Sequence, residues 1–180
     1  MKFRSQMSIS RKPRKSRSLG HIWSVLLPFY FLAAATLDPH EVTNREYLQF
    51  VAATGHPPPE YWINGRYAAG KENEPVVLVN WHEAVQYCRW LGRRLPTVGE
   101  WTSTCEAGKL KKRGNIWEWT STEVDIGRQA FKALCGPSGS CDCSHRYHPE
   151  WKNEVKGFRC IRDAAPLTWL PLSILQEVYS

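Results

Sequence analysis

The chain has 180 residues, with 24 Lys and Arg against 17 Asp and Glu, a net charge of +7, and 42% hydrophobic residues. This length suits one domain, and this apolar fraction is enough to bury a core, which excludes a disordered chain, a collagen-like repeat and a coiled coil. The first 17 residues hold seven cations and no acid, so the rest of the chain carries 24 − 7 = 17 cations against 17 anions. Because a nucleic-acid-binding domain needs a basic face on its folded part, we expect no nucleic-acid partner.

The basic start is followed by an uncharged apolar stretch, from Ile22 to Leu37, with small residues at Ala33-Ala34-Ala35. A basic run, a short apolar stretch and a small-residue site are typical of a secretory signal peptide. Pro28 interrupts the stretch. The stretch is also shorter than the roughly 20 residues of a spanning helix, so we expect no stable membrane span. The alternatives are a basic disordered tail that precedes a buried strand, or a true start at Met7. Export would place the protein in the periplasm or outside the cell.

Three segments have the sequence of a capping box, in which a polar side chain precedes a Glu by three residues: Thr43 to Glu46, Asn80 to Glu83 and Thr97 to Glu100. In this motif the first side chain accepts from a backbone amide while the Glu bonds back to the cap, which satisfies two amides at the helix start. The motif and the apolar spacing after it predict three helices: Asn44 to about Thr54, Trp81 to Leu91, and a shorter helix after Thr97 that ends near Gly108.

Turns and short segments separate these helices. Asn64-Gly65 is typical of a tight turn, and the run from Glu74 to Val79 is typical of a strand leading into the second helix. The connector from Lys109 to Arg113 is basic, and we expect it to lie in solvent. The nine tryptophans indicate that large rigid side chains fill an interior rich in loops. These features predict an α+β fold.

Eight short motifs occur in an order that resembles the formylglycine-generating enzyme family, also called sulfatase-modifying factor domains. They are Val42 to Tyr47, Pro75-Val76-Val77, Asn80-Trp81 through Ala84, Tyr87 to Gly92, Arg94 to Thr97, Glu100-Trp101, Gly114 to Thr120 and Gly157 to Cys160. The resemblance covers about Leu37 to Asp163. It implies a variant of the C-type-lectin fold, with two main helices, small twisted antiparallel sheets, long loops and bound calcium.

This resemblance also defines the domain organisation that we expect. Residues 1–36 would be a basic leader and an apolar segment that together form a signal peptide. Residues 37–163 would be the formylglycine-generating-enzyme-like domain, and residues 164–180 a C-terminal tail. The tail lies beyond the usual end of the family, and its apolar part, Leu167 to Leu172, is suited to packing on the body or on a partner.

In the best-known members of the family, a pair of cysteines near the C-terminal end binds copper(I), and oxygen converts a Cys of a protein substrate such as a sulfatase into formylglycine. Soft thiolates suit copper(I), which agrees with this ligand choice. The resemblance implies Cys135 and Cys141 as catalytic residues and copper ligands, with His145 as a nearby polar group. Five residues separate Cys135 from Cys141 here, where the copper enzymes have four.

Other roles for these cysteines stay open. Six cysteines in an exported chain invite disulfides, whose fifteen possible connectivities the sequence cannot decide. Cys141 and Cys143 are too close for an easy bridge, so we expect different partners for them, or free thiols. A zinc site is a further option, with Cys135, Cys141, Cys143 and His145 as the metal ligands.

Two other cysteines have a simpler expectation. Cys88 lies on the apolar face of the second predicted helix, and Cys160 follows Gly157-Phe158-Arg159. Free Cys is among the most buried residue types, so both are expected to act as small buried hydrophobic side chains.

The chain also departs from the family in ways that bear on activity. Only Lys109 to Arg113 separate the third helix from the Gly114 motif, where the family has a long insert, and Phe131 to Leu134 replace an expected Arg-Gly-Gly-Ser-Trp strand. Missing loops matter because loops carry binding and catalytic residues on a rigid scaffold. The alternative function is therefore a non-catalytic, C-type-lectin-like binding module or a shortened relative without the redox site.

Overall fold

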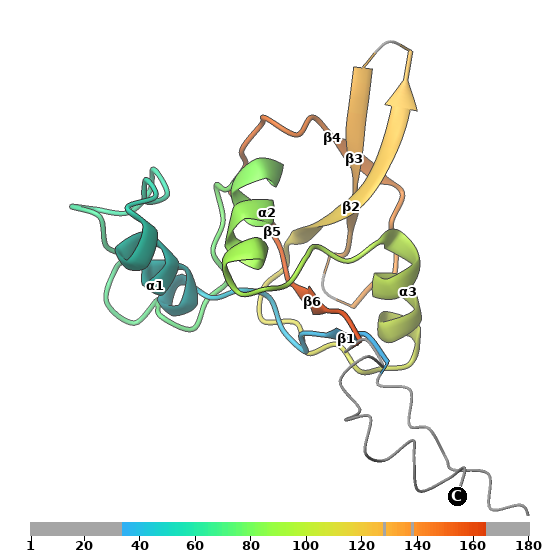
Figure 1. The fold of residues 1–180 in the computed structure, drawn as a ribbon, viewed down its shortest axis with the longest axis horizontal. Helices are drawn as coiled ribbons and strands as arrows, with labels where there is room; N and C mark the ends of the chain where they lie inside the picture. The colour runs from blue at the N-terminus through green and yellow to red at the C-terminus, as the bar shows by residue number, and fades with distance from the viewer. Residues whose placement is uncertain (1–33, 128, 138, 165–180) are drawn as a thin grey trace, which may run out of the picture. The chain divides into compact units, whose positions relative to one another are not determined.

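The computed structural model describes residues 34–127, 129–137 and 139–164, which Figure 1 draws in colour. The predicted leader, apart from its last three residues, and the predicted tail, apart from Ala164, lie outside the described residues. Within the described ranges, no helix is long and apolar enough to cross a membrane.

Three helices begin at the residues that the capping boxes predict. They are α1 (Asn44–Thr54), α2 (Trp81–Trp90) and α3 (Val98–Glu106). In each, the cap side chain accepts the amide of the Glu three residues later, and that Glu accepts the amide of the cap. The left-handed conformation of Gly55, with φ at 71°, ends α1 as expected from a glycine at this position.

The strands form two sheets in the described part of the chain. The larger sheet has the order β4-β3-β2-β5, and the smaller one pairs β1 with β6. Their bounds are β1 (Thr36–Leu37), β2 (Trp117–Ile126), β3 (Gln129–Cys135), β4 (His145–Tyr147), β5 (Lys156–Gly157) and β6 (Ile161–Arg162). We expected antiparallel sheets, and the other strand pairs are antiparallel, but β5 pairs parallel to β2.

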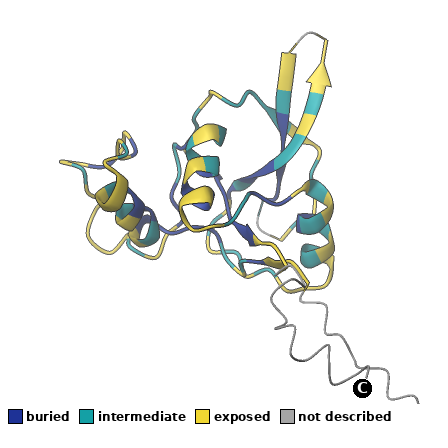
Figure 2. Ribbon diagram, in the orientation of Figure 1, coloured by how far each residue is buried: buried dark blue, intermediate teal, exposed yellow. Residues whose placement is uncertain are grey.

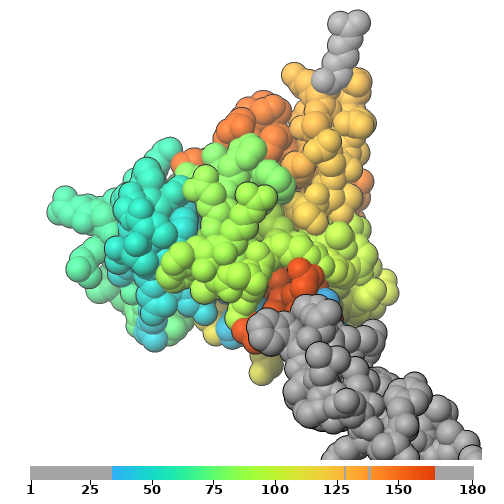
Figure 3. Space-filling view, in the orientation of Figure 1, coloured from blue at the N-terminus to red at the C-terminus, as the bar shows by residue number. Residues whose placement is uncertain are grey.

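Strands β2 and β3 form a long antiparallel hairpin with an irregularity between Trp119 and Glu123. Its far end is exposed while its base is buried, as Figure 2 shows. In the space-filling view the hairpin stands out from the surface beside α3 (Figure 3). Sequence motifs locate the start of β2 but not its length, because the outer half of the hairpin buries little apolar surface.

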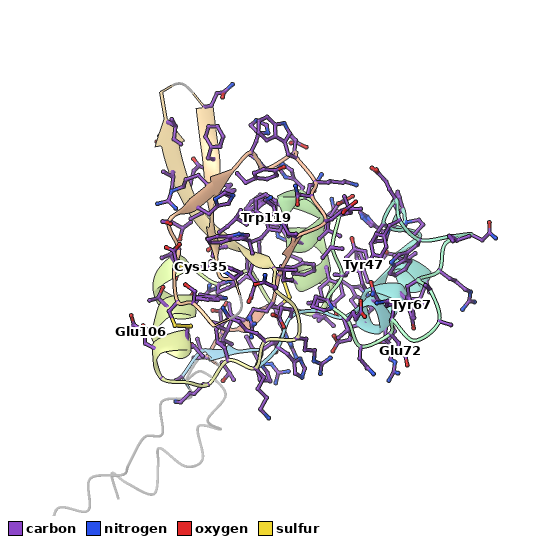
Figure 4. The ribbon with its side chains drawn as sticks, turned by 180° about the vertical axis from the view of Figure 1, so that it is seen from behind. Tyr47, Tyr67, Glu72, Glu106, Trp119 and Cys135 are labelled. Carbon is purple, nitrogen blue, oxygen red and sulfur yellow. A yellow bond between two sulfur atoms is a disulfide. The ribbon has the colours of Figure 1, made fainter. Side chains whose placement is uncertain are left out.

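The base of the hairpin has two buried faces. Trp119 and Leu134 are register partners and pack with α1 and α2, including Tyr47. The neighbouring pair, Glu118 and Cys135, points to the other face because successive strand residues alternate. Cys135 packs there with Trp101 of α3. The base of the hairpin therefore separates a core of α1 and α2 from a smaller core beneath α3 (Figure 4).

The segment from Glu74 to Val79 does not form the strand that its composition suggests. It makes one isolated bridge, between Pro75 and Thr43. Leu78 has φ at 54°, in the left-handed region that residues other than Gly rarely adopt, and this interrupts the extended run. By contrast, the predicted turn at Asn64-Gly65 is confirmed: both residues have positive φ, and Ile63 and Arg66 bond across it.

Candidate redox site

All six cysteines of the chain are in disulfides, which join Cys88 to Cys160, Cys105 to Cys141 and Cys135 to Cys143. Cys88 and Cys160 are fully buried, as predicted, but they are bonded to each other across a separation of 72 residues. The expectation of two separate hydrophobic side chains is wrong for that reason. The other two disulfides lie together at the end of β3 beneath α3.

The Cys135–Cys143 disulfide closes a short loop after β3. Its Cα atoms are 4.0 Å apart. Cys135 is fully buried and packs against Trp101, while Cys143 is partly buried at the edge of the same cluster. The hydroxyl oxygen of Thr102 on α3 lies 3.3 Å from the Cys143 sulfur. Helix α3 thus covers this pair of sulfurs.

The Cys105–Cys141 disulfide ties the last turn of α3 to the same loop. This disulfide borders a pocket of about 330 Å³. The pocket is lined by Cys105, Leu110, Lys112, Gly139, Ser140 and Cys141. Cys105 is partly buried and Cys141 is exposed. This disulfide therefore faces a pocket, whereas the Cys135–Cys143 disulfide lies deeper.

Lys112 forms part of the pocket wall. Its ammonium donates to the carbonyl oxygens of Pro137 and Ser140, each at 2.9 Å, and lies 4.5 Å from the centre of the Trp101 ring. Burial lowers the pKa of Lys112. The expectation of a connector lying wholly in solvent is wrong at this position, because Lys112 turns inward to hold the loop that carries Cys141.

A buried ion cluster supports the site from below. The Arg159 guanidinium bonds both oxygens of Glu118, at 2.5 and 2.8 Å, and lies 3.6 Å from Glu41. The indole of Trp101 donates to Glu118 at 3.0 Å. All three charged side chains are fully buried. Burial, and next the nearby Glu118 carboxylate, raise the pKa of Glu41. The cluster therefore holds in place the Trp101 side chain that packs against Cys135.

His145 lies on the other face of the sheet. It is the register partner of Leu134, which packs into the core of α1 and α2 rather than with Cys135. Its ring stacks on Trp117, with 4.7 Å between ring centres. Burial, followed by the Lys156 ammonium, lowers the pKa of His145. His145 therefore belongs to a surface of aromatic side chains rather than to the sulfur cluster.

We call this surface the aromatic surface. It consists of Trp117, His145, Tyr147, His148 and Trp151. Trp151 is 54% exposed. The Lys156 ammonium lies 3.7 Å from the centre of the Tyr147 ring. Stacked rings that include an exposed tryptophan can bind a flat or apolar group by stacking and apolar contact.

The structure pairs the predicted site residues differently from the sequence expectation. Cys135 joins Cys143 rather than Cys141, because the loop turns Cys143 back to the end of β3 and carries Cys141 towards α3. Cys141 and Cys143 have different partners, as their spacing predicts. The described residues contain no group of three or more His, Cys, Asp or Glu side chains placed to hold a metal. His145 lies on the other face of the sheet from the Cys135–Cys143 disulfide.

Sequence reasoning missed two contributors to the site. The third predicted helix, after Thr97, contains Cys105, but its sequence does not connect Cys105 with the other cysteines. Lys112 belongs to the connector that the sequence predicts to lie in solvent. The even number of cysteines was a signal that each needs a partner, but the contact between Cys105 and Cys141 spans 36 residues. Only the packing of α3 against the end of β3 brings them together.

The arrangement of helices, small sheets and long loops defines the class of fold, a variant of the C-type-lectin fold. A solved structure described as the crystal structure of CarF matches with a TM-score of 0.55 and 15% identity, over 73% of this chain and 87% of that one. At this identity the match supports the fold alone.

Sequence comparison gives the family. Residues 30–113 match the model of the sulfatase-modifying factor enzyme 1-like domain. The formylglycine-generating enzyme of Mus musculus is 36% identical over 34% of this chain and 20% of its own length. That of Thermomonospora curvata is 26% identical over 56% of this chain and 51% of its own length. The chain therefore carries a domain of the formylglycine-generating enzyme family, and it spans between a fifth and about half of these two relatives.

Proposed function

We propose that this domain is an oxygen-dependent oxidase that converts a Cys of a protein or peptide, such as a sulfatase, into formylglycine. In this proposal the reduced thiols of Cys135 and Cys143 form the reactive pair. The observation that carries it is the direct bond between these two sulfurs beneath α3. Family membership and the named activity of the relatives support the substrate class.

The residues present fit copper(I) as a cofactor. Two adjacent thiolates are soft ligands of the kind that copper(I) prefers, and side chains already close enough to bond each other can reach one ion. Cys135 and Cys143 would hold the metal, which would supply oxygen activation. Calcium stays a proposal from the family alone, as a structural ion.

The chain's own residues would position and shield this pair. Cys135 is held by strand pairing at the end of β3, and Trp101 covers it from α3. The indole of Trp101 is in turn fixed by Glu118 and through it by Arg159. The Thr102 hydroxyl, 3.3 Å from the Cys143 sulfur, can donate to the thiolate and lower its basicity.

The electron balance of the reaction requires a reductant in addition to oxygen and the substrate Cys. Oxidation of a thiol-bearing carbon to an aldehyde, with release of hydrogen sulfide, supplies two electrons. Reduction of dioxygen to water takes four, so a reductant must supply the other two. Thiols are reductants that exchange with disulfides, so a thiol can also open the Cys135–Cys143 bond before metal binding.

Copper binding and product formation test the proposal. The full chain would be reduced with a phosphine, titrated with copper(I) without oxygen, and then incubated with a Cys-containing peptide, thiol and oxygen. We expect stoichiometric binding, followed by the mass change of Cys to formylglycine. Cys135→Ser and Cys143→Ser should each abolish both. The control, C105S/C141S, removes two thiols outside the reactive pair and should still bind copper after reduction with the phosphine. Absence of both binding and product in the unaltered chain would refute the catalytic proposal.

A binding module is the second candidate function. The observation that favours it is that every cysteine is bonded and an exposed aromatic surface lies on the other side of the sheet. In this case the disulfides are structural, and the aromatic surface binds the ligand. Alkylation with and without reductant separates the two: thiols that stay protected under mild reductant favour the module, whereas ready opening of Cys135–Cys143 favours the oxidase.

We also propose export of the protein, on the basis of the leader at residues 1–36. Three disulfides fit an oxidising compartment. The β1–β6 pairing supports a domain that runs from about residue 37 to residue 163. Analysis of the mature N-terminus after secretion tests the leader.

A further inference from the structure

Two disulfides with different access lie next to each other in this domain. Cys105–Cys141 borders a pocket of about 330 Å³, and Cys141 is exposed. Cys135–Cys143 has one fully buried member and lies under α3. A thiol from solution can therefore reach the first disulfide through the pocket more readily than the second.

The two disulfides border the same buried cluster. One residue separates Cys141 from Cys143 in the chain. On α3, Thr102 lies 3.3 Å from the Cys143 sulfur, and Cys105 follows three residues later on the same helix face. Cys105 and Cys143 also both pack against the cluster that contains Cys135. Cys105 therefore lies beside the cluster that holds Cys135–Cys143. We call Cys135–Cys143 the inner disulfide and Cys105–Cys141 the outer disulfide.

The charge beside the pocket favours exchange at the outer disulfide. The Lys112 ammonium donates to the carbonyl of Ser140, the residue before Cys141. A nearby cation stabilises a thiolate, and a thiol of lower pKa leaves faster in thiol–disulfide exchange. Lys112 would therefore speed the opening of the Cys105–Cys141 bond. The neighbouring Asp142 carboxylate is directed to the amide and hydroxyl of Ser144, each at 2.8 Å.

We propose that the pocket is a site for a thiol reductant, and that Cys105–Cys141 passes reducing equivalents from it to the Cys135–Cys143 pair. This role for the outer disulfide rests on the proposed function, in which Cys135 and Cys143 react as free thiols. The outer disulfide is then a redox intermediate rather than a structural brace.

The exchange proceeds through three thiol–disulfide reactions, each of which forms one S–S bond as another breaks or a thiol pair leaves oxidised. Two thiol molecules open Cys105–Cys141 and leave as their own disulfide. The Cys105 thiolate attacks the Cys143 sulfur, which breaks the Cys135–Cys143 bond and releases the Cys135 thiolate. Cys141 then attacks Cys105 and releases Cys143. The outer disulfide is restored, two electrons have moved inward, and two protons end on Cys135 and Cys143. No bridge between Cys141 and Cys143 is required.

The order of opening is the first test, on the oxidised full chain with glutathione as the probe. Samples are quenched by alkylation, and each disulfide is followed by tandem mass spectrometry. We expect thiols at Cys105 and Cys141 before those at Cys135 and Cys143. In C105S/C141S, the inner disulfide should open at least about tenfold more slowly, because glutathione must attack a covered sulfur. An unchanged rate would overturn the relay. The buried Cys88–Cys160 bond reports unfolding, since it should stay closed in a folded chain.

A single variant traps the intermediate. In Cys141→Ser, the Cys105 thiol can attack Cys143 but cannot be released, so a Cys105–Cys143 disulfide and a free Cys135 thiol should accumulate. Cys105→Ser is the matched control and should not trap this species. If the trapped bond is absent while Cys135–Cys143 stays intact in Cys141→Ser, the relay is refuted.

The pocket wall gives a test without any loss of cysteine. Lys112→Gln keeps hydrogen-bond donors but removes the charge, and it should slow the opening of Cys105–Cys141 by about three- to tenfold. Lys111→Gln, an exposed neighbour outside the pocket lining, should open at the unaltered rate. If the Cys105–Cys141 bond opens at equal rates in the two variants, the role of Lys112 is refuted. Should C105S/C141S fail to fold, the same result also counts as refutation of the relay. These rates do not depend on copper, so failure of copper binding and failure of the relay are distinguishable.

Discussion

Arg159 shows how one side chain can organise a small interior. It bonds both oxygens of Glu118 and also donates to the carbonyls of Asp38 and Pro39, at 3.1 and 2.7 Å. These partners come from segments 41 and about 120 residues away in the chain. The sequence motif marks Arg159 as a family residue, but only the fold shows that its charge is buried with two carboxylates.

Loss of this charge should be costly. Arg159→Met leaves Glu118 and Glu41 buried without their cation, and removal of one partner of a buried ion pair destabilises a protein by about 3–5 kcal/mol. We expect a lower midpoint of urea unfolding by roughly that free energy. Arg162→Met, on the exposed residue of β6, should change it little. Equal effects of the two substitutions would show that Arg159 does not hold the cluster together.

At the scale of single elements, the helix starts were predictable because a capping box is a local interaction over four residues. The extended run from Glu74 to Val79 was predicted wrongly, since the positive φ of Leu78 is imposed by its surroundings rather than by its own preference. The amide of Leu78 bonds to Asn153, far along the chain. Elements whose conformation depends on such distant partners cannot be read from composition.

Helix α3 has a start that depends on charge. Glu100 closes its capping box by accepting the Thr97 amide at 2.8 Å, and Arg94 bonds both Glu100 oxygens at 2.9 and 2.6 Å. The Arg94 hydrogen bonds lower the pKa of Glu100 from 4.5 to about 2. A depressed pKa in the folded state means that the charged carboxylate stabilises the fold above pH 4.5, and that this contribution is lost as the pH falls towards 2.

Glu100→Gln tests this dependence, because Gln retains the capping box and removes the charge. Thermal unfolding should show the variant less stable than the unaltered chain above pH 4.5, with the difference shrinking as the pH approaches 2. Glu106→Gln, an exposed position at the end of α3, is the control and should show no such convergence. A difference that stays constant across this range would exclude the charge of Glu100 as its source.

At the scale of the whole molecule, the three disulfides add stability that a larger domain would obtain from a larger hydrophobic core. The sequence indicated that the six cysteines can form disulfides and that Cys141 and Cys143 do not bond to each other. It could not select the three pairs. That choice depends on where α2 and α3 pack against the sheet. The same limit applied to the candidate site: its region was predicted, while the pairing of Cys135 with Cys143 required the fold.

The Cys88–Cys160 bond should contribute most to global stability. It closes a segment of 72 residues between α2 and the end of the domain, and both sulfurs are buried. Removing a native disulfide from a small secreted domain costs about 2–5 kcal/mol. We therefore expect C88A/C160A to unfold at a lower urea concentration than C105S/C141S, whose bond closes only 36 residues. The reverse order would show that burial and span do not decide the contribution here.

The pairing of β1 with β6 has a practical consequence. Thr36 lies opposite Arg162, so the two ends of the described domain meet on neighbouring strands. Gly127, just after β2, is exposed and offers a place where new termini cost little packing. Such a geometry suits circular permutation, and it also lets the domain be inserted as a cassette into a surface loop of another protein without separating the ends of that loop.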